Sequence, residues 1–209
     1  MTSVYNAIAG RSGERLAALS DAVFAVAMTL LVLDIRPPAL EHIHGDAELL
    51  RALGRLAPQL VAFLMSFMTL GIFWVGQQTQ HAMLSRTDRS YTWIHIGFLM
   101  AVCLLPFSTD LLAEFIAFRA ALLIYWANIL ALGVLLLAAW YRAKWSALVK
   151  PDAPPGLDNA FIRRILIAQG LYAFGAALCV FDTWWSIGFI VAVQLVYVIG
   201  PRFRPLSWL

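Results

Sequence analysis

Charged residues are scarce in this sequence. Asp, Glu, Lys and Arg make up 13% of its 209 residues, whereas a soluble domain carries about 25%. Hydrophobic residues make up 62%, and the mean hydropathy is +0.78. This composition excludes an ordinary soluble domain and predicts a membrane protein with several spans. Residues 1–13 lack the apolar core and small-residue cleavage site of a secretory signal, so we expect the first span to be retained.

Residues that build metal sites and active sites are also sparse. The two cysteines, Cys103 and Cys179, both lie in apolar stretches, where we expect them to pack as small apolar side chains. Helical metal-ligand spacing is absent from the scattered histidines, which are His42, His44, His81 and His95. The sequence contains no Walker A loop, no dinucleotide fingerprint and no nucleophile elbow. We therefore expect no enzymatic activity, no bound metal and no cofactor.

Hydropathy divides the chain into six stretches that could cross a hydrocarbon core, which takes about 20 residues. They lie near 16–36, 56–77, 92–112, 119–141, 163–181 and 184–200. Only Asp182 and Thr183 separate the last two, which predicts an antiparallel helical hairpin. The sequence thus predicts an all-α polytopic membrane protein, a single domain over residues 1–209 with six transmembrane helices.

Two further details concern the shape and packing of these spans. Asp46 is a candidate N-cap, so we expect the second span to begin there, before its apolar run, and Pro58 to kink it. Gly170, Gly175 and Gly188 are expected to allow close contact between helices. The last two spans show no pattern that indicates a function beyond scaffold.

The distribution of basic residues predicts which side of the membrane each loop occupies. Cytoplasmic loops carry the excess of Lys and Arg. With the N-terminus inside, 11 of the 15 basic residues are cytoplasmic, the exceptions being Arg36, Arg51, Arg55 and Arg119. Six spans return the C-terminus to the same side, so we expect both termini in the cytoplasm.

The first span combines a membrane-length apolar run with a polar cluster, Arg15, Ser20 and Asp21, in its first turns. An ionisable group there costs several kcal/mol unless it is paired. At about 100° per residue, one face carries an apolar stripe flanked by Thr29, formed by Leu19, Ala22, Val26, Leu30 and Leu33. Periodicity alone leaves this stripe open as core or lipid contact, or as a functional surface. In an ideal helix, Ser20 and Asp21 point away from the stripe, whereas Arg15 lies on it. Arg15 therefore either lies at a cytoplasmic vestibule, or the first turn of the helix is irregular.

Several motifs match one protein family. Arg15, Leu19, Ser20 and Asp21 have the spacing of an R-x-x-x-F-S-D first-helix signature, with leucine in place of phenylalanine. The match continues at Thr29, at residues 33–35 (Leu-Asp-Ile), at 73–74 (Phe-Trp), at 86–89 (Arg-Thr-Asp-Arg) and at 105–109 (Leu-Pro-Phe-Ser-Thr). The sequence therefore resembles the transmembrane protein 175 family of potassium channels, most strongly over residues 15–112.

The resemblance implies a tetrameric channel without a re-entrant pore loop, whose pore is lined by the first helices of four subunits. The TVGYG-type filter of ordinary potassium channels is indeed absent. By position, Val26 would form an apolar constriction ring, with Leu30 and Leu33 stacked outward from it. Thr29 corresponds to a family threonine near the filter. Asp34 would either concentrate cations at the outer mouth or form a solvated helix end.

The same resemblance gives the polar cluster a structural role. Arg15, Ser20 and Asp21 would tie the first helix to the second and third through a buried network with Trp74, since each buried polar group needs a partner. Gln77 stands where bacterial relatives tend to have a histidine. An amide forms hydrogen bonds but does not titrate, so we expect any pH response that relies on that histidine to be reduced.

The predicted function is passive conduction of potassium and other monovalent cations by a homotetramer in the plasma membrane of a bacterial-type cell. Its expected partners are further copies of the chain, membrane lipids and the permeant cations, with no nucleic acid. Two alternatives remain open. A proton- or ion-coupled secondary transporter would use Asp21 near the midplane of the membrane. A non-conducting scaffold would use the apolar stripe as a dimer seam.

Overall fold

Helices account for almost all of the chain that the structure, a computed structural model, describes, which is residues 12–38 and 43–199. The long helices are α2 (Gly13–Leu30), α4 (Ala57–Ala82), α5 (Arg89–Glu114), α6 (Arg119–Trp145), α7 (Leu157–Ala177) and α8 (Thr183–Ile199). Short 3-10 helices extend two of them, η1 (Leu31–Asp34) after α2 and η3 (Leu178–Val180) after α7, and the short helix α3 (Asp46–Gly54) precedes α4. The predicted all-α class is confirmed.

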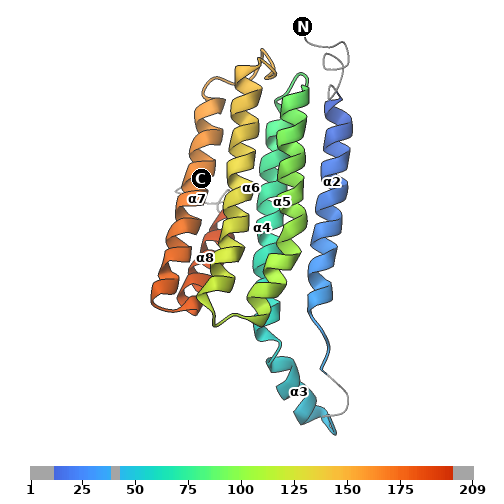
Figure 1. Ribbon diagram of the computed structural model, residues 1–209, viewed down its shortest axis with the longest axis vertical. Helices are drawn as coiled ribbons and strands as arrows, with labels where there is room; N and C mark the ends of the chain where they lie inside the picture. Colours follow the sequence, from blue (N-terminus) through green and yellow to red (C-terminus); the bar gives the residue numbers. More distant parts are fainter. Residues whose placement is uncertain (1–11, 39–42, 200–209) are drawn as a thin grey trace.

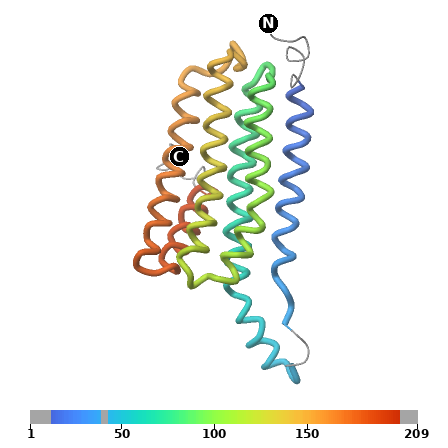
Figure 2. Tube along the Cα trace, in the orientation of Figure 1, coloured from blue at the N-terminus to red at the C-terminus, as the bar shows by residue number. Residues whose placement is uncertain are grey.

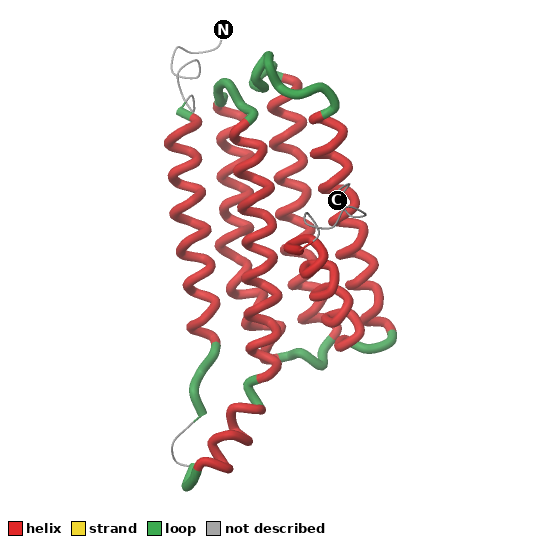
Figure 3. Tube along the Cα trace, turned by 180° about the vertical axis from the view of Figure 1, so that it is seen from behind, coloured by secondary structure: helices red, strands yellow, loops and turns green. Residues whose placement is uncertain are grey.

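The long helices run side by side in a bundle (Figure 1). α2 forms one edge of the bundle and packs against α4 and α5. α7 and α8 form the opposite edge, where α8 packs against α7 and α4. The Cα trace shows α3 continuing beyond the end of the bundle (Figure 2), and the reverse view again places α2 at the outer edge (Figure 3). Among the described residues, α2 therefore has neighbouring helices on one side only.

Within the described residues, five helices are long and apolar enough to cross a membrane, namely α2 with η1, α4, α5, α6, and α7 with η3. The sixth predicted span corresponds to α8, a shorter apolar helix of 17 residues. The tight connection predicted before it is present, because only Phe181 and Asp182 separate η3 from α8. Five helices of the bundle thus have the length and the apolar composition of membrane spans, which agrees with a membrane protein of several spans.

The start of the second span differs from the prediction. Asp46 is the first residue of the separate helix α3, whose N-cap is Gly45, and α4 begins only at Ala57. Pro58 lies in the first turn of α4, where a missing backbone N–H removes no helical hydrogen bond. The predicted continuous, kinked helix is therefore wrong, because proline begins a new helix here instead of bending an existing one.

The three glycines expected to allow close contact behave differently. A Cβ atom on Gly175 would lie 2.9 Å from side-chain atoms of Ile190 and Phe189, so α7 and α8 do approach closely there. A Cβ atom on Gly170 or Gly188 would meet nothing within 4 Å in the described structure. The close approach of the last two long helices therefore depends on Gly175.

A buried polar network, not foreseen from the sequence, joins α4, α5, α6 and α8. Thr109 of α5 donates a hydrogen bond to Ser66 of α4 over 2.6 Å, and Ser66 donates to the Tyr125 hydroxyl of α6 over 3.2 Å. Gln194 of α8 donates to Thr69 of α4 over 2.7 Å. These side chains are at most 2% exposed. Hydrogen bonds in such a low-dielectric interior are strong, so the network fixes these four helices as the scaffold on which α2 packs.

Candidate functional site

One face of α2 and η1 is buried. Leu16, Ser20, Phe24, Ala27 and Leu31 are at most 5% exposed. They recur three or four residues apart, which places them on one side of the helix. This side packs against α4 and α5. The scaffold therefore sets the rotation of α2 about its own axis and determines which residues point away from the bundle.

The opposite face carries the predicted constriction residues. Val26 is 57% exposed, Leu30 43% and Leu33 67%, and Thr29 is exposed beside them. The Thr29 hydroxyl donates to backbone carbonyls of its own helix, at 2.8 Å for Val26 and 3.0 Å for Ala25. The structure thus brings the predicted pore residues together on one face. A pore built from this face requires more than one copy of the chain.

Asp21 ties α2 to α4. Its Oδ1 accepts hydrogen bonds from the indole Nε1 of Trp74 at 2.9 Å and from the side-chain amide of Gln78 at 3.2 Å. The sequence had suggested Trp74 as a partner but not Gln78. Gln78 follows Trp74 by four residues, so both lie on the same face of α4. The spacing of four residues between Trp74 and Gln78 is the sequence signal that identifies Gln78 as a second partner of Asp21.

Ser20 ties α2 to α5. Its hydroxyl lies 2.7 Å from Nε2 of His95, and both residues are at most 1% exposed. The imidazole of His81, near the end of α4, packs against that of His95 with ring centroids 4.6 Å apart. Gln77 hydrogen-bonds to His81. Gln77 therefore joins α2 indirectly, through the two histidines, and not through Asp21.

The histidine pair corrects the view of scattered histidines. His81 and His95 lie on successive helices, α4 and α5, joined by a short loop around Ser85. His81 lies four residues before Ser85 and His95 ten residues after it, so their distances from the loop do not mark them as neighbours in the sequence. His44 is exposed, and His42 lies outside the described residues. No group of three or more His, Cys, Asp or Glu suited to a metal occurs in the described chain.

Arg15 lies apart from these polar contacts. It is exposed, and its guanidinium makes no hydrogen bond or ion pair within the described residues. The first turn of α2 is regular, with the Ser12 hydroxyl accepting from the Arg15 backbone N–H at 3.4 Å. Arg15 therefore remains on the exposed face with Leu19 and Val26, as an ideal helix requires.

Asp34 ends η1 at the opposite end of this helix. The residue is partly buried, and its Oδ2 is buried without a hydrogen-bond partner among the described residues. It is therefore not a fully solvated helix end. A carboxylate in this position carries its charge close to the exposed Leu33.

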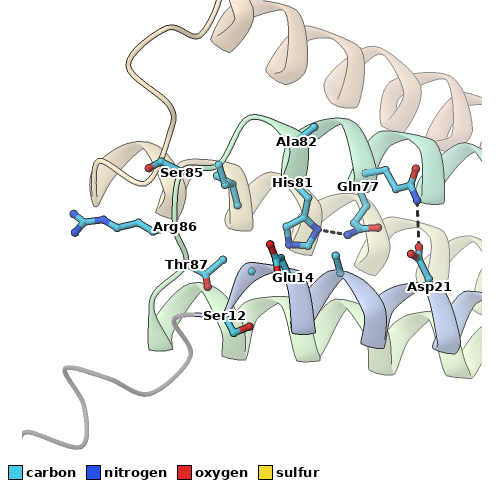
Figure 4. Close-up of a pocket in the computed structure, with 13 residues that line it drawn as sticks. Ser12, Glu14, Asp21, Gln77, His81, Ala82, Ser85, Arg86 and Thr87 are labelled. Atoms are coloured by element: carbon cyan, nitrogen blue, oxygen red, sulfur yellow. Dashed lines mark hydrogen bonds between the residues drawn. The ribbon is translucent and has the colours of Figure 1, made fainter.

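A pocket of 690 Å³ lies between the start of α2 and the end of α4. Asp21, Gln77, Gln78 and His81 contribute to its walls, and Glu14 points from α2 toward His81 (Figure 4). The Asp21 contact with Gln78 and the Gln77 contact with His81 close one side of the pocket (Figure 4). The acidic side chains in these first turns thus face α4 and not the exposed stripe.

Comparison with known proteins gives this arrangement a family. The model of the family described as endosomal/lysosomal potassium channel TMEM175 matches residues 15–106. A potassium channel of Chamaesiphon minutus is 32% identical over 185 residues, which cover 86% of this chain and 91% of that relative. The chain belongs to the TMEM175 family. The family suggested by the first-helix motifs is therefore confirmed, and it is a family of ion channels, not of enzymes.

Other members of the TMEM175 family support this placement. A potassium channel of Streptomyces collinus is 31% identical, with 90% of this chain and 84% of the relative covered. The human endosomal/lysosomal proton channel TMEM175 is 22% identical, and the match covers 88% of this chain but 36% of the human protein. The crystal structure of a lysosomal potassium-selective channel TMEM175 homolog from Chamaesiphon minutus superposes with a TM-score of 0.79 at 28% identity, covering 91% of this chain and 98% of that one.

Proposed function

We propose that the chain is one subunit of a homotetrameric potassium-permeable channel whose pore is lined by α2. The observation that carries this proposal is the division of α2 into a face held by the scaffold and an exposed apolar face of membrane length. The two bacterial relatives are named potassium channels. Conduction is passive, and the permeant species are potassium and other monovalent cations.

In this proposal four copies of Val26, Leu30 and Leu33 form stacked apolar rings around the pore axis. Such rings force an ion to lose part of its hydration shell but offer no oxygen ligands in return, so discrimination between cations is modest. Thr29, beside these rings, adds one hydroxyl oxygen per subunit and supports the selectivity that the pore has. Because its hydroxyl proton is donated to the helix backbone, the remaining lone pairs on Oγ1 are free to face a cation.

The polar contacts of α2 act as its brace. Asp21 with Trp74, and Ser20 with His95, hold the helix at the rotation that turns the rings toward the axis. Asp34 lies at the outer mouth, where an acidic ring raises the local cation concentration. Arg15 lies at the other end, and its role is developed below.

The proposed membrane placement follows the basic residues. Both termini lie in the cytoplasm of a bacterial-type cell, and α8 is the sixth crossing. Its 17 residues span about 26 Å at 1.5 Å per residue, slightly less than the roughly 30 Å of a hydrocarbon core. Local thinning of the bilayer or snorkelling of flanking residues accommodates such a difference.

Flux of potassium and sodium through reconstituted liposomes tests the pore. Val26→Ala and Leu30→Ala widen the rings, so each is expected to raise potassium flux severalfold and to lower the preference for potassium over sodium. Val134→Ala on α6 is the matched control, because Val134 is 54% exposed on another helix. If both α2 variants match the control in flux and preference, α2 does not form the constriction.

The same assay separates the channel from the alternatives. Uptake that saturates and follows a second ion gradient would indicate a coupled transporter that uses Asp21. In the structure this carboxylate already accepts hydrogen bonds from Trp74 and Gln78, which favours the bracing role. Absence of any cation flux would indicate a scaffold.

A further inference from the structure

Arg15 shares the face of α2 that we propose to line the pore. The helix is uninterrupted from Gly13 to Leu30, so residues 15, 19, 22 and 26 lie within about 60° of one another at 100° per residue. All four are exposed. Arg15 precedes Val26 by 11 residues, which corresponds to about 16 Å along the helix axis.

The positive charge of Arg15 has no neutralising partner on this face among residues 12–38 and 43–199. Arginine stays protonated at any physiological pH, and within the described residues its guanidinium forms no ion pair. Glu14 is directed across the pocket toward His81 (Figure 4). Asp21 accepts its hydrogen bonds from α4. Both neighbouring carboxylates are therefore turned away from the stripe.

We infer that Arg15 places a ring of four guanidinium groups at the cytoplasmic mouth of the pore and makes the cation current asymmetric. This inference rests on the proposed function. The ring lowers the local concentration of cations on its own side, just as a ring of the opposite sign raises it. On the side of Asp34, the charges of Asp34 and Asp110 outnumber that of the nearby Arg36, so cations that enter from that side meet no such depletion. Current from the outer to the cytoplasmic side therefore exceeds current in the reverse direction at equal and opposite voltages.

Salt concentration provides an independent signature of this mechanism. The Debye length is about 10 Å at 0.1 M and about 3 Å at 1 M salt. At the lower concentration the field of the ring reaches across the mouth, and at the higher concentration it is screened close to each guanidinium. Asymmetry that arises from Arg15 must therefore fade as salt is raised, whereas asymmetry caused by the shape of the pore would persist.

Single-channel currents in planar bilayers with equal KCl on both sides test the inference. The rectification ratio is the current toward the cytoplasmic side divided by the current in the reverse direction at equal and opposite voltages. For the wild type we expect a severalfold ratio in about 0.1 M KCl and a ratio close to one in about 1 M KCl. Arg15→Gln is expected to lie near a ratio of one in both, and Arg15→Glu to rectify in the opposite sense. Lys150→Gln removes the same charge from an exposed loop position after α6 and should rectify as the wild type does. Recordings are taken from channels of known orientation in the bilayer, so that both the size and the sense of the rectification are measured.

Charge restoration distinguishes the field of Arg15 from a change in structure. Arg15→Cys is prepared with Cys103→Ser and Cys179→Ala, since these are the two native cysteines. A cationic methanethiosulfonate should restore the rectification of the wild type, and an anionic one should reverse it. A conducting wild type whose rectification survives Arg15→Gln would overturn this inference alone. A wild type without potassium current would overturn the proposed function, and this inference with it.

Discussion

At the scale of single residues, two consecutive side chains of α2, Ser20 and Asp21, form hydrogen bonds to two different helices. Ser20 hydrogen-bonds to His95 of α5, whereas Asp21 accepts from Trp74 and Gln78 of α4. One residue of helix turns a side chain by about 100°, so two consecutive polar residues reach two different helices. This pair resists rotation of α2 in either direction, which an apolar face alone does not do.

Asp88 performs two roles at the start of α5. Its Oδ1 accepts from the Tyr91 backbone N–H at 2.7 Å as the N-cap, and its Oδ2 accepts from Arg142 of α6 at 2.6 Å. Partial burial alone would raise the pKa of the Asp88 carboxyl, but the Tyr91 N–H and the Arg142 guanidinium outweigh it and hold the pKa below its ordinary value. The ionised form therefore stabilises the folded protein.

We expect Asp88→Asn to lower the free energy of unfolding by about 0.5–1 kcal/mol at neutral pH. Asparagine still caps the helix, but the ion pair with Arg142, which is partly exposed, is lost. The advantage of the wild type is present above the unfolded pKa of about 3.9 and is lost as pH falls through the lower folded pKa. Thermal unfolding in detergent across pH checks this, with Asp152→Asn, exposed in the loop after α6, as control. A difference between wild type and Asp88→Asn that persists undiminished at pH of about 3 would contradict the assignment.

At the scale of helices, the sequence predicts what depends on local period and hydropathy. The long helices and the two faces of α2 follow from apolar runs and from spacings of three and four. The sequence does not predict the break between α3 and α4, because Asp46 and Pro58 both fit one continuous helical pattern. The contacts of His81 with His95, and of Gln194 with Thr69, were missed for another reason. These contacts depend on which helices become neighbours in space, and no local sequence pattern determines the neighbours.

The close approach of α7 and α8 leads to a prediction at this scale. Alanine has about 1 kcal/mol more helix propensity than glycine, so Gly170→Ala, which meets nothing within 4 Å, should stabilise the protein. Gly175→Ala should be less stable than Gly170→Ala by about 1–3 kcal/mol, because its Cβ overpacks against Ile190 and Phe189. Thermal unfolding in detergent measures the difference. Equal gains from both substitutions would show that the α7–α8 contact yields without cost.

At the scale of the whole molecule, α2 with η1 is one of the two candidate membrane spans of the described chain that a single chain leaves least covered, the other being α7 with η3 at 22% buried. α2 lies at the edge of the bundle in both views (Figures 1 and 3), and 28% of its apolar window is buried, against 50% for α5. The brace nevertheless fixes its orientation. A helix held firmly but covered on one side only is prepared for contact with further copies of the chain.

The tetramer is the prediction that belongs to this scale. Native mass spectrometry of the detergent-solubilised protein should give four times the 23.2 kDa chain mass. In a background with Cys103→Ser and Cys179→Ala, Val26→Cys should cross-link with a short thiol reagent into a dimer band on denaturing gels, because each link joins two chains across a narrow axis. Val134→Cys on the exposed face of α6 should remain a monomer under the same reagent. A native mass of one or two chains would contradict a fourfold pore, and a dimer linked through Val26→Cys at that mass would support the scaffold with α2 as its seam.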